Sequence, residues 1–181
     1  LFSVQDPFDP AQLDIMNSRL PPIWMPEAQP PYLLGTDEQG RDILSGILYG
    51  LRISLLVGIM GVVLAATIGI ALGLMAGYYG GFVDTVVMRV ADVQLTFPAI
   101  LIALLIDGVA KSVLGGHLDP ATTLTVLVFS IGLSFWVQYA RTVRGSVLVE
   151  KNKDYVAAAR LIGLSSPVIM VRHVLPNVLG P

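Results

Sequence analysis

The segment ISLLVGIMGVVLAATIGIALGLMAGYY, residues 53–79, decides the fold class of this chain. It contains no charged residue. As an α-helix it would be about 40 Å long at about 1.5 Å per residue, and the hydrocarbon core of a bilayer is about 30 Å thick. We therefore expect residues 53–79 to form a transmembrane helix.

The composition of the whole chain agrees with a protein that lives in lipid. Hydrophobic residues make up 54% and charged residues 13%, with a mean hydropathy of +0.73, whereas soluble domains are about one quarter charged. The net charge of −2 and the scattered Lys and Arg residues argue against nucleic acid as a partner. Because there is no cysteine, disulfides and thiolate chemistry are excluded. The sequence predicts an all-α membrane protein.

Two further spans are expected. Residues 120–140 form a second uncharged run, and residues 84–106 form a third apolar stretch that carries Arg89 and Asp92 in its first half. Pro98 removes a helix hydrogen bond and should kink this third span. The chain begins with Leu1, so we expect it to be a fragment of a longer protein.

The distribution of Lys and Arg predicts the orientation. If three spans alternate in direction, seven of these cations lie on the side of the C-terminal residues and four on the other side. By the positive-inside rule, residues 1–52 are then outside and residues 148–177 are cytoplasmic. The seven cations are Arg89, Arg141, Arg144, Lys151, Lys153, Arg160 and Arg172, and the four are Arg19, Arg41, Arg52 and Lys111.

The sequence divides into an outer region, residues 1–52, and a membrane region, residues 53–181. Prolines make the first part of the outer region an extended strap: Pro7, Pro10, Pro21, Pro22, Pro26 and Pro30. Thr36 and Gln39 have the spacing of a capping box, and the apolar residues that follow predict a short amphipathic helix at the outer interface. The alternative is that these residues are simply the first turns of the span.

Small residues recur at every fourth position of the first span. Close approach of another backbone is possible along such a ridge, so we expect a packing face, with a role in the substrate path as the alternative. The ridge consists of Gly61, Ala65, Gly69, Gly73 and Gly77. The run from Gly77 to Gly81 then predicts a tight turn.

Arg89 and Asp92 are three residues apart, on one face of a helix. They can pair with each other or with a neighbouring helix. Charges at membrane depth normally face a bundle interior or an aqueous path, but Arg89 is close enough to the cytoplasmic end to reach the surface. Two interpretations of Arg89 and Asp92 therefore remain, interfacial anchoring and gating of a path. The kink at Pro98 could likewise shape a translocation path or only serve packing.

Signatures of catalysis are lacking in the sequence. His117 and His173 are far apart and have no cluster of ligands around them, so we expect no metal site and no enzymatic activity in this chain. A glycine-rich phosphate loop that ends in Lys and Ser or Thr is also missing. Any energy for transport must come from a partner or from an ion gradient.

The residues after the last span predict two short helices joined by a turn. Asp154 is expected to cap a helix over residues 155–162, and Gly163 to end it in a left-handed conformation. Ser166 should cap a second helix with Pro167 at its first position, and Pro176 should end that helix. A helix-turn-helix of this kind could be a lever attached to the spans or only a connecting loop.

The same residues carry a resemblance to a known family. Ala157-Ala158-Ala159, Gly163 and Leu175-Pro176 resemble the EAA loop of the inner-membrane permeases of bacterial ABC importers. The stretches 34–42, 49–54, 77–81 and 96–98 (LGTDEQGRD, YGLRIS, GYYGG and TFP) resemble the C-type permease of the dipeptide, oligopeptide and nickel group. Together they cover about residues 33 to 181.

The resemblance implies a transmembrane helix bundle of the MetI-like type, with about three of an expected six spans in this chain. It implies a pore subunit in the bacterial inner membrane, paired with a second permease, two cytoplasmic ATPase subunits that hold ATP and Mg, and an extracytoplasmic substrate-binding protein. The substrate would be di- or oligopeptides, with nickel or another small solute as the alternative. A secondary transporter and a structural membrane subunit without ATPase coupling are the competing interpretations.

One position departs from the family pattern. The first position of the EAA motif is normally Glu, and here it is Ala157. We expect Asp154, Arg160 and Arg172 to supply contacts to the ATPase in its place. The full set of residues expected to couple the chain to an ATPase is Asp154, Ala157, Ala158, Ala159, Arg160, Gly163, Arg172, Leu175 and Pro176.

Overall fold

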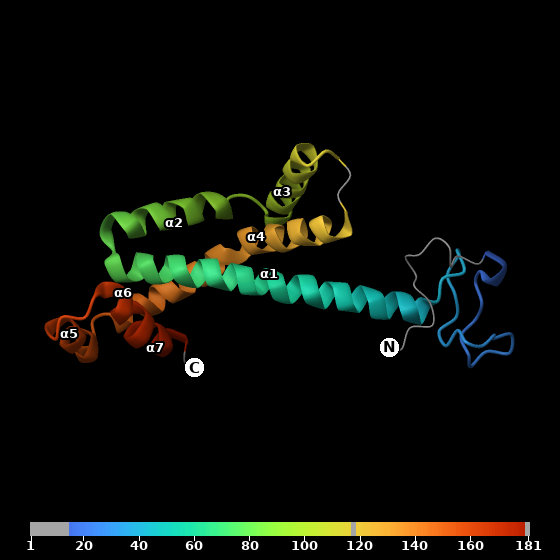
Figure 1. Cartoon of the computed structure of the whole chain (residues 1–181), viewed down its shortest axis with the longest axis horizontal. Coiled ribbons are helices and arrows are strands. Elements are labelled where there is room, and N and C mark those ends of the chain that lie inside the picture. The colour runs from blue at the N-terminus through green and yellow to red at the C-terminus, as the bar shows by residue number, and fades with distance from the viewer. Residues whose placement is uncertain (1–14, 117–118, 180–181) are drawn as a thin grey trace. The chain divides into compact units, whose positions relative to one another are not determined.

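A computed structural model describes residues 15–116 and 119–179, and within these ranges the regular secondary structure is helical. Pro7, Pro10 and His117 lie outside the described residues. The chain contains two compact units, up to residue 56 and from residue 57 onward. The helices, coloured along the chain in Figure 1, are η2 (Ile15–Asn17), α1 (Ile43–Tyr79), α2 (Gly81–Leu95), α3 (Ala99–Val113), α4 (Pro120–Glu150), α5 (Asp154–Leu161), α6 (Ser166–Ile169), η3 (Met170–Val174) and α7 (Leu175–Leu179).

The first unit consists mainly of turns before α1 begins, as its prolines predict. The Thr36 hydroxyl accepts the backbone N–H of Leu20 at 2.9 Å, and the Arg19 N–H donates to the Asp37 carbonyl at 2.9 Å. An isolated antiparallel bridge joins Thr36 to Asp42. These bonds fold the strap back on itself.

The expected capping box is wrong. The side chain that caps α1 belongs to Asp42, whose Oδ2 accepts the N–H of Ser45 at 2.9 Å, because α1 begins at Ile43 rather than after Thr36. The Thr36 hydroxyl instead accepts the N–H of Leu20 in the strap. Residues 43–52 form the first turns of α1, so the simpler of the two alternatives for this stretch is the one that the structure has.

Two helices, α1 and α4, are each long and apolar enough to cross a membrane. The pair formed by α2 and α3 passes the same test but is bent by 93° at its break. Pro98 causes the break because it has no N–H and disfavours a helical conformation at the preceding residue. The expected kink is therefore a complete interruption, and α3 begins afresh at Ala99.

Within the second unit, α1 and α4 pack in parallel. Going along α1, Gly61 contacts Ile131, Gly73 contacts Ala140 and Gly77 contacts Val147, so the partner number on α4 rises with the number on α1. The small residues of α1 thus lie where it packs on α4, and Ala65 among them is only 1% exposed.

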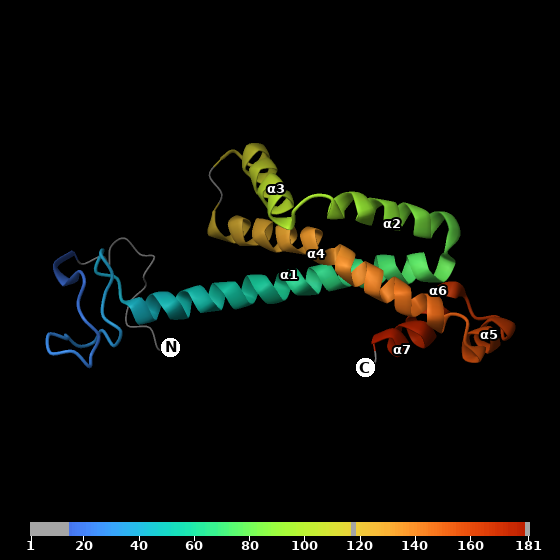
Figure 2. The ribbon, with the colours of Figure 1, turned by 180° about the vertical axis from the view of Figure 1, so that it is seen from behind.

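The helix α2 runs antiparallel to α4, alongside it in both views (Figures 1 and 2). Asp84, at the start of α2, is bonded to Arg144, and Gln94, near its end, accepts the indole N–H of Trp136 at 2.8 Å. Because α1 and α4 point the same way, the chain must return across the membrane between them. This geometry favours the α2–α3 pair as a broken span, which gives the described residues up to three spans.

Candidate functional site

The residues that follow α4, here called the 154–179 segment, form a compact group at the end where α1 and α4 both finish (Figures 1 and 2). It contains α5, α6, η3 and α7. The predicted lever motif lies here.

The first helix of the segment has the predicted end but not the predicted cap. Lys153 occupies the N-cap position of α5, and Asp154 is the first helical residue, where its negative charge suits the positive end of the helix dipole. Gly163 has φ +83°, the left-handed stop that the sequence predicts. A β-branched residue would be strained there.

The second helix differs from the prediction at both ends. Ser165, not Ser166, is at the N-cap of α6, and Pro176 does not end the helix. The backbone widens into the π-helical turn η3 and continues as α7 to Leu179. This wider turn makes room for a proline, which lacks an N–H and would clash in a regular α-helix.

The inner face of the segment is fixed to the spans by an apolar cluster. Val156 and Val174 are fully buried and Ile169 is 1% exposed, and they pack with residues of α1 and α4. The buried members of the cluster are Leu74, Tyr78, Val143, Val147, Val156, Ala159, Ile169, Met170 and Val174. The segment therefore cannot move without carrying the ends of both spans with it, unless this cluster opens.

Polar bonds reinforce the attachment. The carboxylate of Glu150, at the end of α4, accepts the Tyr155 hydroxyl at 2.7 Å and the Lys153 ammonium at 2.8 Å. Burial is the main cause that raises the pKa of Tyr155 to about 12, and the hydrogen bond to Glu150 is the second cause. The phenol therefore remains a donor at neutral pH. Asn177 donates to the carbonyl of His173 at 2.7 Å and ties η3 to α7.

The outer face of the segment exposes large apolar side chains among charged ones. Leu161 is 88% exposed and Ile162 is 75% exposed, an unusual state for large aliphatic side chains at the tip of two helices. Of the predicted coupling residues, Ala159 is buried and Leu175 half-buried; the exposed ones are Asp154, Ala157, Ala158, Arg160, Gly163, Arg172 and Pro176. Exposed small residues, Ala157 and Ala158, lie next to Leu161 in this surface.

Two ion pairs join α2 to α4; pairing of Asp92 with a neighbouring helix was one of the two expected alternatives, whereas the pair of Asp84 with Arg144 was not anticipated from the sequence. Arg144 holds Asp84 with two hydrogen bonds, one of them 2.6 Å long, and Asp92 pairs with Arg141 rather than with Arg89. Arg89 is exposed. A pairing of residues that are 60 positions apart leaves no periodic signal in the sequence.

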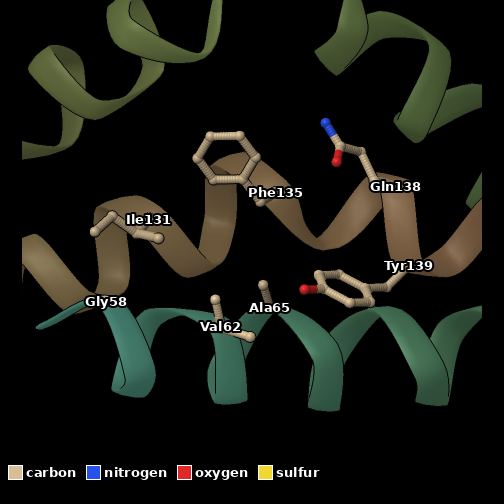
Figure 3. A pocket seen from close by; sticks show the side chains of 7 residues that line it. All are labelled: Gly58, Val62, Ala65, Ile131, Phe135, Gln138 and Tyr139. Atoms are coloured by element: carbon tan, nitrogen blue, oxygen red, sulfur yellow. The ribbon is translucent and has the colours of Figure 1, made fainter. Parts of the chain in front are cut away.

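A cavity of about 280 Å³ lies between α1 and α4 (Figure 3). One amide and one phenol are its polar groups, and the rest of its lining is apolar. It is lined by Gly58, Val62 and Ala65 of α1 and by Ile131, Phe135, Gln138 and Tyr139 of α4. In the part of the chain that the structure describes, acidic and histidine side chains do not gather into a group that could hold a metal ion.

The arrangement of two long apolar helices, a broken helix pair between them and a helical segment after the last helix agrees with a family match. Residues 69–181 match the family described as binding-protein-dependent transport system inner membrane component. The chain belongs to this family of permeases. The predicted resemblance, the helix-bundle fold and the location in the bacterial inner membrane are thereby confirmed.

Curated relatives of this permease have names that refer to peptides. It is 39% identical to the dipeptide transport system permease protein DppC of Haemophilus influenzae, over 97% of this chain and 56% of the relative. It is 40% identical to DppC of Escherichia coli K12, over 97% of this chain and 55% of the relative. A putative peptide transport system permease protein of Brucella suis is 42% identical over 84% of this chain and 49% of the relative. The permease chain thus spans about half the length of the curated relatives it matches.

Proposed function

We propose that this permease is a pore subunit of an ATP-driven importer of di- or oligopeptides, and that the 154–179 segment receives the movement of a cytoplasmic ATPase subunit. The observation that carries the proposal is the two-sided character of the segment. Its inner face is packed on the ends of α1 and α4, while its outer edge, with Leu161 and Ile162, is exposed. An element built in this way can take up a push on one side and pass it to two spans on the other.

The lack of charge in residues 53–79 and 120–140 supports coupling to a partner over coupling to an ion gradient. Residues 53–79 contain no ionisable acid or base, whereas secondary transporters place ion-coupling groups near the middle of the bilayer. ATP and Mg would be bound by the partner subunits. An extracytoplasmic protein would deliver the substrate to the opposite side, and a second permease would complete the pore.

Peptides are favoured over nickel as the substrate because relatives at about 40% identity are named dipeptide or peptide permeases. The cavity between α1 and α4 suits this class. Its single amide, from Gln138, can bond a peptide group, and its apolar wall tolerates varied side chains. Residues 148–177 are cytoplasmic in this proposal and residues 1–52 are outside.

The test is dipeptide uptake into proteoliposomes that contain the full-length permease, its partner permease and the ATPase subunits, with the binding protein added. We expect uptake to require all components and ATP. Gly163→Val should abolish uptake, since a β-branched residue at φ +83° costs about 1–3 kcal/mol, whereas Gly163→Asn should retain it because Asn tolerates this conformation. Equal uptake by both variants would contradict the role of the segment.

A further inference from the structure

The corner between α1 and α2, residues 77–84, is contacted by three cations. Lys151 donates to the Gly77 carbonyl at 2.7 Å, and the Arg160 guanidinium carbon lies 5.2 Å from the centroid of the Tyr78 ring. The third cation, Arg144, is bonded to Asp84. Two of the three belong to α4 or its end, and Arg160 belongs to α5.

The contact between Arg160 and Tyr78 joins an exposed residue of α5 to a buried residue of α1. The Tyr78 ring is only 8% exposed and is part of the apolar cluster beneath the 154–179 segment. Arg160 is exposed on α5. A guanidinium over an aromatic face is attracted by the quadrupole of the ring, so this pair links the exposed edge of the segment directly to the last turn of α1.

The corner passes directly into α2. Gly80 has φ +66° and Gly81 has φ +52°, so two residues in the left-handed region reverse the chain between α1 and α2. Asp84 then binds Arg144 at the start of α2. A shift of Tyr78 is therefore passed through a short connection to the helix that begins the broken span.

We propose that Arg160 is a positioning residue for transport, which acts through the Tyr78 ring and transmits movement of the 154–179 segment to the α1–α2 corner. This inference rests on the proposed function. It assigns Arg160 to a contact within the permease, in place of the ATPase contact expected from the sequence. Asp154 and Arg172 remain as candidates for that external contact.

The experiment measures dipeptide uptake per ATP hydrolysed by the reconstituted full-length complex. Arg160→Gln and Tyr78→Leu should each lower this ratio about two- to five-fold, the factor that matches a lost cation–π contact. Arg160→Lys and Tyr78→Phe keep a cation and a ring, and they should retain most of the ratio. Because both residues act through one contact, the double variant Arg160→Gln/Tyr78→Leu should be no worse than either single variant.

A second readout separates this inference from the proposed function. A cysteine at Ala158 should crosslink to the ATPase subunit equally well with Arg or Gln at position 160. If Arg160→Gln lowers the crosslinking yield whichever residue stands at 78, or if the losses in the double variant add, the inference is overturned and the proposed function stands. If the Ala158→Cys complex that keeps Arg160 and Tyr78 never crosslinks to the ATPase subunit, the proposed function itself fails. Should Tyr78→Leu not accumulate in the membrane, the comparison of Arg160→Gln with Arg160→Lys decides the question.

Discussion

The packing of α1 against α4 offers a sharp test of the fold, because at one point Gly73 of α1 lies directly against the backbone of α4. A Cβ at Gly73 would lie 2.4 Å from the Ala140 carbonyl oxygen. An ordinary contact begins near 3.4 Å, so Gly73→Ala must push the two helices apart by about 1 Å. Backbone atoms cannot rotate away as a flexible side chain can.

Gly58 of the same helix is the matched control. A Cβ there would meet nothing within 4 Å, so Gly58→Ala should gain about 0.5–1 kcal/mol from the better helix propensity of alanine. Overpacking at Gly73 should cost about 1–3 kcal/mol. Because Gly73→Ala gains the same propensity, we expect it to be less stable than Gly58→Ala by the overpacking cost of about 1–3 kcal/mol.

The assay is SDS-induced unfolding of the full-length permease in mixed micelles, followed by circular dichroism. The predicted outcome is a lower unfolding midpoint for Gly73→Ala than for the unaltered protein, and an equal or higher midpoint for Gly58→Ala. Two variants with the same midpoint would refute the parallel packing of α1 on α4 through the small residues.

Two further predictions concern polar contacts. Asp84→Asn should destabilise the permease by about 1–3 kcal/mol, because it leaves the charge of Arg144 unmatched in a partly buried site. The double variant Asp84→Asn/Arg144→Gln removes both charges and should destabilise it less. In the same double-mutant cycle, the more exposed pair Asp92–Arg141 should show almost no coupling. The raised pKa of Tyr155 predicts a phenol that titrates near 12, so that its stabilising effect is present below about pH 10 and is lost as the pH rises through about 12. The difference in phenolate absorbance between the unaltered protein and Tyr155→Phe checks this, and a difference signal centred near 10 would contradict it.

Local sequence signals predicted the elements whose cause is local. The uncharged run 53–79 is within α1, and Gly163 ends α5 in the left-handed region as expected. Pro98 was recognised as a disruption, but the size of the bend was underestimated, because the 93° between α2 and α3 depends on how both helices pack on α4. The prediction that Pro176 ends its helix was wrong, because a π-helical turn just before it allows the helix to continue.

Contacts between distant elements could not be predicted. The cap of α1 was assigned to Thr36 because the spacing fits, yet Thr36 is held by the strap and Asp42 takes the role. The contact of Arg160 with the Tyr78 ring was likewise not predicted, and the expected contact of Arg160 with an ATPase stays a prediction. Both outcomes depend on which segments meet in space, and a single sequence carries no record of that.

The most direct test of the central claim is cysteine crosslinking between the 154–179 segment and the ATPase subunit. Since the chain has no cysteine of its own, each introduced cysteine reports on one position of the segment. Leu161→Cys lies on the exposed edge, whereas Val156→Cys, in the same helix, replaces a fully buried side chain. We predict that Leu161→Cys crosslinks to a cysteine in the groove of the ATPase, with a yield that changes when ATP is bound, and that Val156→Cys does not. Absence of crosslinking from Leu161→Cys and its exposed neighbours, or an equal yield from Val156→Cys, would contradict the claim that this segment couples the permease to its ATPase.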